Sequence, residues 1–223
     1  MTFSIAGVCP DTGMVGSAIA SSSICVASRC AYVRSGIGVA LTQNVTNPDL
    51  GPLALDLMSD QTSPPNILKA LAIEDTDIQW RQIGVLNLVG EGATFSGNHA
   101  LGTSATAQGK NCIALGNLLD NSGVPDAMIK SFENRSGHLA ERLLKALEAG
   151  LTTGGELGTV QSAGLLVAAG PAWPVVDLRV DWHMEPISEL RTIWRNYRPQ
   201  MDAYINRAKD PANAEPYGVP GDE

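Results

Sequence analysis

Thr2 is the residue whose type and position best suit covalent chemistry. It follows Met1 directly and opens a strand-like run that continues to Val8. If Met1 were removed, as a small following side chain permits, Thr2 would carry both a hydroxyl nucleophile and a free α-amine. That amine, which titrates at about pH 8 in short peptides, could act as the base for its own hydroxyl. The alternative interpretation is that Met1-Thr2 simply begins an ordinary first strand.

Small hydroxyl residues occur in the segment that we expect to pair with this first strand. The two-residue period of a strand places Ser4 on the same face as Thr2. The next strand-like segment contributes Ser17, Ser21 and Ser22. This wall of small polar groups would leave room for a small substrate beside the N-terminus. Small side chains also let two sheets approach closely, so packing remains the alternative role for most of them.

Three further residues could assist a nucleophile at position 2. Arg34 is a candidate cation, able to lower a nearby pKa or to hold a carboxylate. Gln43 and Asn44 lie between a predicted strand and a predicted helix. Their amides could recognise a polar ligand, and an Asn44 side chain could donate to a developing oxyanion. The nearby Asn47-Pro48 is equally well explained by turn formation.

A charged face alternates with an apolar face in the segment 176–183. Same-face neighbours on a strand lie about 7 Å apart, so the arginine of this face can bridge both of its aspartates. We expect mainly a structural ion-pair network, and a catalytic or ligand-binding face is the alternative. Two potential metal ligands do not make a metal site, so no metal is predicted. The charged face consists of Asp177, Arg179, Asp181 and His183.

Composition limits the possible partners and compartment. The 223 residues have a formal net charge of −8 and contain 44% hydrophobic residues. An acidic chain without a basic stripe argues against nucleic acid and anionic membrane as partners. The four cysteines lack paired spacing, no signal-like segment precedes the first strand, and no apolar run approaches ~18 residues. We expect a cytoplasmic protein with a small-molecule ligand or substrate and no cofactor.

The predicted order of elements is strands, two helices, strands, two helices, strands and a last helix. This order predicts an α+β fold with two mostly antiparallel sheets and helices on both outer faces, a four-layer αββα sandwich. A single domain is expected over residues 1–209, followed by a tail rich in Pro and Gly over 210–223. The last helix starts near Pro186, and we expect Pro199 to kink it. Its apolar stripe of Leu190, Trp194, Tyr197 and Met201 is expected to be buried. Part of this helix, or the tail, is expected to meet a second subunit in a homodimer or larger homo-oligomer. The predicted strands are 2–9, 14–21, 24–31, 36–43, 80–88, 93–96, 112–115, 161–170 and 175–182, and the predicted helices begin near 52, 66, 125, 138 and 186.

Several stretches taken together resemble a bacterial and archaeal family known as domain-of-unknown-function family 1028. The resemblance implies the αββα sandwich of the N-terminal-nucleophile hydrolases but no particular reaction. Proteasome-like hydrolases of that fold place an Asp and a Lys near their N-terminal Thr, whereas the comparable stretches here offer Ala20 to Ser22 and Arg34. The matching pieces are 1–5, Thr42-Gln43, Asn47-Pro48, Gly51, 81–84, 116–119, the 143–150 helix, Gly154-Gly155, 161–163, 177–181, His183, Pro186 and Leu190.

The function expected from these features is an amidohydrolase acting on a small amide or peptide-like metabolite. Thr2 would attack, Arg34 would stabilise charge, and Asn44 would donate to the oxyanion. Gln161 and Ser162, within one of the matching pieces, join the candidate binding residues. A second enzyme hypothesis moves the chemistry to the charged face of 177–183. The non-enzymatic alternative is a ligand-binding or assembly protein that retains the sandwich.

Overall fold

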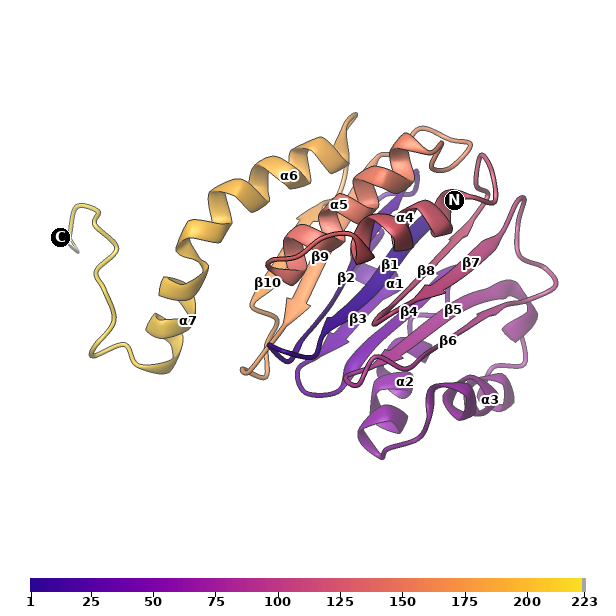
Figure 1. Cartoon of the computed structure of the whole chain (residues 1–223), viewed down its shortest axis with the longest axis horizontal. Helices are drawn as coiled ribbons and strands as arrows, with labels where there is room; N and C mark the ends of the chain where they lie inside the picture. The colour runs from indigo at the N-terminus through magenta and orange to yellow at the C-terminus, as the bar shows by residue number, and fades with distance from the viewer. Residues whose placement is uncertain (222–223) are drawn as a thin grey trace.

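The computed structural model describes residues 1–221, which form two antiparallel sheets with helices on their outer faces (Figure 1). The strand order is β10-β9-β2-β1-β8-β7 in the six-stranded sheet and β3-β4-β5-β6 in the four-stranded sheet. The larger sheet contains β1 (Thr2–Cys9), β2 (Met14–Ser21), β7 (Ala105–Gly109), β8 (Cys112–Asn117), β9 (Ser162–Ala168) and β10 (Val176–Val180). The smaller sheet contains β3 (Ala31–Arg34), β4 (Gly38–Asn44), β5 (Arg81–Asn87) and β6 (Gly92–Ser96).

Three apolar clusters separate the layers. The largest lies between the six-stranded sheet and its helices, the second between the two sheets, and the third between the four-stranded sheet and its helices. The predicted α+β class with antiparallel sheets is therefore confirmed. No helix within residues 1–221 is long and apolar enough to cross a membrane. The helices are α1 (Ala27–Cys30), α2 (Leu50–Ser59), α3 (Pro64–Glu74), α4 (Val124–Glu133), α5 (Leu139–Thr152), α6 (Pro186–Tyr197) and α7 (Met201–Lys209), with 3₁₀ turns at Ile78–Trp80 and Arg198–Gln200.

Strand β1 lies inside the larger sheet and is buried on both faces. Phe3 and Ile5 pack in the cluster with α4 and α5, whereas Ala6 and Val8 pack between the sheets. The two-residue alternation therefore directs the side chains of Thr2 and Ser4 toward the inter-sheet layer. The predicted hairpin of β1 and β2 is confirmed, with Thr2 opposite Ser21 in the register.

Two local predictions were wrong. Residues 24–31, predicted as a strand, instead form a loop and the short helix α1, followed by β3. Here Val26, Ala27 and Cys30 fill the inter-sheet cluster, and a short apolar run fits either a strand or a buried helix by pattern alone. Strand β7 was not predicted. It is an edge strand whose residues are partly buried or exposed, and its Ala and Gly content gives little strand signal.

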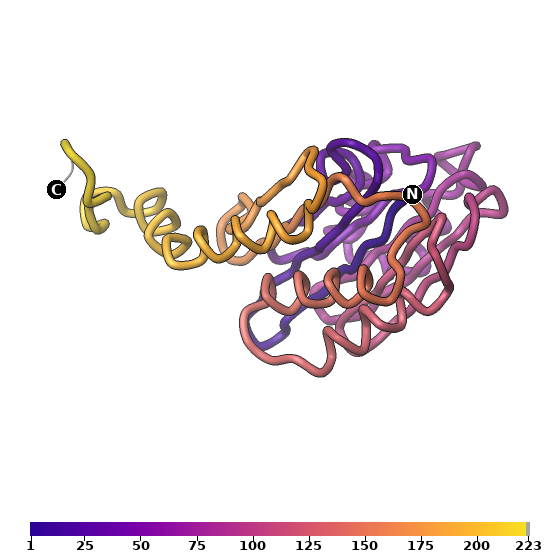
Figure 2. The backbone as a smooth tube through the Cα atoms, turned by 90° about the horizontal axis from the view of Figure 1, so that it is seen from above, coloured from indigo at the N-terminus to yellow at the C-terminus, as the bar shows by residue number. Residues whose placement is uncertain are grey.

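The C-terminal helices run from the edge of the larger sheet away from the body of the molecule (Figures 1 and 2). Leu190, Trp194 and Met201 are buried, as predicted, and Tyr197 is half-buried with its hydroxyl donating to the Val175 carbonyl at 2.8 Å. Pro199 falls in the 3₁₀ turn that separates α6 from α7, which agrees with the expected kink. The domain limits, the tail boundary and the homo-oligomer stay predictions.

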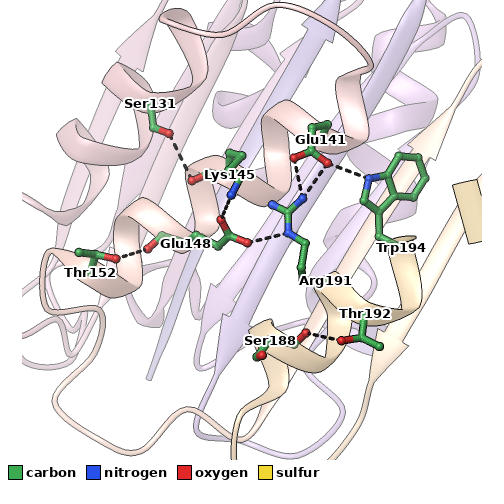
Figure 3. A network of polar contacts seen from close by, with 9 residues as sticks. All are labelled: Ser131, Glu141, Lys145, Glu148, Thr152, Ser188, Arg191, Thr192 and Trp194. Atoms are coloured by element: carbon green, nitrogen blue, oxygen red, sulfur yellow. Dashed lines mark hydrogen bonds and ion pairs between the residues drawn. The ribbon is translucent and has the colours of Figure 1, made fainter. Parts of the chain in front are cut away.

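An ion-pair cluster fixes α6 against α5 (Figure 3). Arg191 on α6 donates to both carboxylate oxygens of Glu141, at 2.6 and 2.7 Å, and to Glu148 at 2.7 Å. The indole of Trp194 donates to Glu141 at 3.0 Å. Burial favours the neutral form of each glutamate, but Arg191 outweighs it and holds the pKa of both carboxyls below the usual range. These contacts stabilise the position of α6, whose first turn borders the candidate site.

Candidate functional site

Thr2 lies at the start of β1 and is almost fully buried, between Ser21 on β2 and Asn117 on β8. Its Oγ1 lies 2.6 Å from the Met1 carbonyl oxygen and 3.3 Å from Ser21 Oγ. The Ser21 hydroxyl also donates to the Met1 carbonyl. With Met1 attached, its carbonyl therefore accepts from both hydroxyls, and the Thr2 nitrogen is an amide that cannot act as a base.

A buried polar network continues from Thr2 between the two sheets. The Ser4 hydroxyl donates to the side-chain Oε1 of Gln43 at 2.7 Å, and the side-chain Nε2 of Gln43 donates to Oε1 of Gln82 at 2.8 Å. Asn117 donates to the same Gln82 oxygen at 3.1 Å, while Gln82 donates to the Gly116 carbonyl at 2.9 Å. Buried amides are costly unless they are paired. Within residues 1–221, Asn117 Oδ1 is buried without a partner, next to Thr2.

Glu156 places a buried carboxylate close to the N-terminus. Its backbone forms an isolated antiparallel β-bridge with Leu119, and the residue is only 5% exposed. Burial raises the pKa of Glu156 from 4.5 to about 7, although the N-terminal ammonium and the neighbouring Ser22 favour the charged form. Among the described residues, neither carboxylate oxygen has a partner in hydrogen-bond geometry. A carboxyl group near the N-terminus can therefore exchange a proton around neutral pH.

A cavity of about 350 Å³ opens beside Glu156, between the end of α5, the loop 154–160 and the start of α6. It borders the N-terminus, because a Cβ atom on Gly158 would lie 2.7 Å from the Met1 Cε atom. The volume falls at the lower end of the range of about 300–1,000 Å³ that is typical of small-molecule sites. The lining residues are Leu151, Gly154, Glu156, Gly158, Thr159, Val160, Met184, Glu185, Pro186, Ile187 and Ser188.

Arg34 lies away from Thr2, which corrects the expectation that its guanidinium would stabilise charge at the Thr2 nucleophile. It forms an ion pair with Asp56 on α2 at 2.8 Å. Arg34 pairs with Gly38 at one end of β4, whereas Ser4 contacts Gln43 at the other end. Five residue steps along β4 separate Gly38 from Gln43, about 16 Å at the usual rise. Arg34 is held by helix α2 because the register of β3 and β4 places it there.

The side chains of Asn44 and Ser162 form hydrogen bonds with backbone groups of nearby segments. The Asn44 amide donates to the Trp80 carbonyl, and its oxygen accepts from the Leu101 amide at 3.0 Å. Ser162 lies opposite Ser21 on β9, but its hydroxyl donates to the Ser23 carbonyl at 2.6 Å and accepts from the Val26 amide at 3.2 Å. Both side chains thus fix loops around the site.

Ser22 and Gln161 lie close to the N-terminus. Ser22 neighbours Glu156, and Gln161 donates its backbone amide to the Ser21 carbonyl at 2.9 Å. Of the residues predicted for the site, the structure brings together Thr2, Ser4, Ser21, Ser22, Gln43, Gln161 and Ser162.

The charged face of 177–183 lies on the edge strand β10 and beyond its end. Arg179 makes a bidentate pair with Asp177, at 2.9 and 3.0 Å, and this contact raises the pKa of Arg179. Both side chains are 39% exposed. His183 accepts from the Glu185 amide through Nδ1 at 3.1 Å. Within residues 1–221, no three His, Cys, Asp or Glu side chains gather in an arrangement that could hold a metal ion. The expected pairing of Arg179 with an aspartate is confirmed.

Sequence reasoning did not single out Gln82, Asn117 or Glu156. Gln82 and Asn117 are amides within otherwise apolar strand segments, and that interruption is a signal that could have marked them. Glu156 follows Gly154-Gly155 and precedes Leu157-Gly158, a composition that is typical of an exposed loop. No local signal marks its burial.

Comparison with known proteins assigns the family. No curated protein matches the chain in sequence. The crystal structure of protein SPO2555 from Silicibacter pomeroyi, itself assigned to DUF1028, is similar, with a TM-score of 0.82 and 28% identity over 88% of each chain. The model of the family of unknown function DUF1028 matches residues 2–190, and this chain therefore belongs to the DUF1028 family.

Proposed function

We propose that, once Met1 is removed, the chain is an N-terminal-threonine amidohydrolase that acts on a small amide or peptide-like metabolite. The observation that carries this proposal is the position of Thr2. It begins an inner strand that is buried from Thr2 to Val8, and its hydroxyl lies 3.3 Å from the Ser21 hydroxyl. The helix–sheet–sheet–helix packing around that strand supports a sandwich of the N-terminal-nucleophile hydrolase type.

The chemistry requires a free Thr2 amine. The Thr2 Oγ1 atom would attack the substrate carbonyl carbon while the α-amine takes the hydroxyl proton. The amine would return that proton to the departing nitrogen, which leaves an ester on Thr2. Water would then hydrolyse the ester and regenerate the hydroxyl. Ser21 is the neighbouring hydroxyl that can relay the proton between Oγ1 and the amine. Arg34, which the register of β3 places at the opposite end of β4 from Gln43, has no part in this proposal.

One observation favours a second candidate function, a non-catalytic ligand-binding or assembly protein. The Met1 carbonyl accepts from both the Thr2 and Ser21 hydroxyls, and the Met1 side chain packs beside Gly158. A retained Met1 would therefore be part of a satisfied, folded N-terminus and would block the proposed nucleophile.

The first measurement is the intact mass of the untagged protein purified from cells. Loss of one methionine is expected. Processed protein is then assayed against a panel of acyl and aminoacyl p-nitroanilides, together with Thr2→Ala, Thr2→Ser and the control Arg34→Ala. Thr2→Ala should lower kcat/KM at least about 10³-fold, as removal of a nucleophile does elsewhere. Thr2→Ser should retain activity, and Arg34→Ala should match the wild type.

Two outcomes would contradict the proposal. Retention of Met1 in the native protein would support the non-catalytic alternative. Processed protein whose activity survives in Thr2→Ala would show that Thr2 is not the nucleophile. A β-lactone electrophile provides a second readout, because it should add its mass to the wild type at Thr2 and leave Thr2→Ala unmodified.

A further inference from the structure

The cavity beside Glu156 combines an apolar wall with an acidic end. Leu151, Val160 and Ile187 supply aliphatic surface, while Glu156 and Glu185 supply two carboxylates. The lining residues given above, all within the described part of the chain, include no Lys, Arg or His. The cavity thus offers a short apolar surface and negative charge, with no side-chain cation of its own.

Glu156 is a buried polar residue of this cavity whose carboxylate oxygens lack hydrogen-bond partners within residues 1–221. It is 5% exposed. Ser22 and the N-terminal ammonium both lie near Glu156 and favour its charged form. In the described residues, however, Ser22 makes no contact with either oxygen in hydrogen-bond geometry, and no ion pair within 4.0 Å joins the ammonium to the carboxylate. An unpaired buried carboxylate is costly, and a donor entering the cavity would remove that cost.

We propose that this cavity binds a small molecule that carries a primary ammonium group on a short apolar chain, with the ammonium bound to Glu156. An ammonium has three donors and no acceptor, which matches two acceptor oxygens that lack donors. Its chain would lie against Leu151, Val160 and Ile187. A divalent metal ion fits less well, because no group of three or more metal ligands gathers within residues 1–221.

This inference goes beyond the proposed function and stands without it. The cavity and Glu156 exist with Met1 in place, so binding requires no nucleophile. Because the Met1 side chain packs against Gly158 at the cavity wall, a bound molecule would lie beside the N-terminus. If Thr2 is also the nucleophile, the substrate class becomes an amide that bears a cationic amine.

The experiment compares n-hexylammonium with n-hexanol, a neutral probe of the same chain length, by titration calorimetry and ligand-observed NMR on the full chain. The wild type should bind n-hexylammonium saturably and at least about tenfold more tightly than n-hexanol, as expected for a charge-assisted contact. In Glu156→Gln this preference should disappear. The matched control Glu185→Gln, at an exposed carboxylate of the same cavity, should change the affinity less than about threefold.

A second variant tests the location without removing the charge. Ser188 is exposed and lines the cavity, so Ser188→Trp should fill the space and abolish binding while Glu156 remains. Thermal melts establish that each variant is folded. The proposal is overturned if the wild type shows no saturable binding, if it binds both probes equally, or if folded Glu156→Gln keeps the preference. Because no turnover is measured, none of these outcomes bears on Thr2.

Discussion

Replacement of Glu156 by Gln should make the protein more stable at neutral and higher pH. Burial raises the pKa of this carboxyl from 4.5 to about 7 in the folded protein. Below pH ~4.5 the group is protonated in both the folded and the unfolded chain, so it contributes no pH dependence there. Between these pKa values the unfolded chain releases its proton while the folded chain keeps it. Stability therefore falls as pH rises through this window.

The magnitude follows from the two pKa values. The difference between 4.5 and about 7 corresponds to about 3 kcal/mol, at 1.36 kcal/mol for each pKa unit. Gln has nearly the shape of the protonated carboxyl group and does not titrate. The free energy of unfolding of Glu156→Gln minus that of the wild type should therefore rise by about 3 kcal/mol between pH ~4.5 and pH ~8 and stay level above that.

Urea denaturation of both proteins across this pH range measures the difference directly. Titrating groups far from Glu156 affect both proteins equally and cancel in the subtraction. Glu185→Gln is the matched control for the loss of a carboxylate, because the residue lines the same cavity but is exposed. The reasoning is refuted if the difference in unfolding free energy between Glu156→Gln and the wild type does not depend on pH, or if the wild type becomes more stable relative to the variant as pH rises.

Two further predictions concern the ion pairs. Arg191→Met should cost about 2–3 kcal/mol of unfolding free energy at neutral pH, less than for a fully buried pair, because Glu141 and Glu148 remain 32% and 30% exposed. Arg191 holds the pKa of both carboxyls below the usual range. The loss of unfolding free energy in Arg191→Met should therefore be present at neutral pH and shrink once the solution is acidic enough to protonate both glutamates. Urea denaturation at several pH values measures this dependence. Arg179→Ala should cost less than about 1 kcal/mol, because Arg179 and Asp177 are each 39% exposed. A large loss of melting temperature in Arg179→Ala, or none in Arg191→Met, would contradict these expectations.

Local sequence patterns determined much of the fold. The β1–β2 hairpin follows from alternating strand residues joined by Pro10-Asp11-Thr12-Gly13, and Gly13 indeed has a φ of +67°. The stripe of α6 predicted both the helix and the burial of Leu190 and Trp194. These features depend on neighbouring residues, so they can be predicted without knowledge of distant contacts.

The site was predictable only in part. Thr2 and Ser4 share a face because alternation along one strand requires it, and the structure adds that Gln43 lies opposite Ser4 across the two sheets. The position of Arg34 depends on the register of β3 with β4, which fixes it beside Asp56. No pattern among neighbouring residues predicts the register of β3 with β4.

Tertiary structure alone decided that Glu156 is buried. Its neighbours in sequence are glycines and threonines typical of an exposed loop, and a glutamate in such a loop would be solvated. The bridge from Glu156 to Leu119 and the approach of α6 enclose it beside the N-terminus. Segments far apart in the chain produce that enclosure, and the raised pKa and the acidic cavity follow from the desolvation it causes.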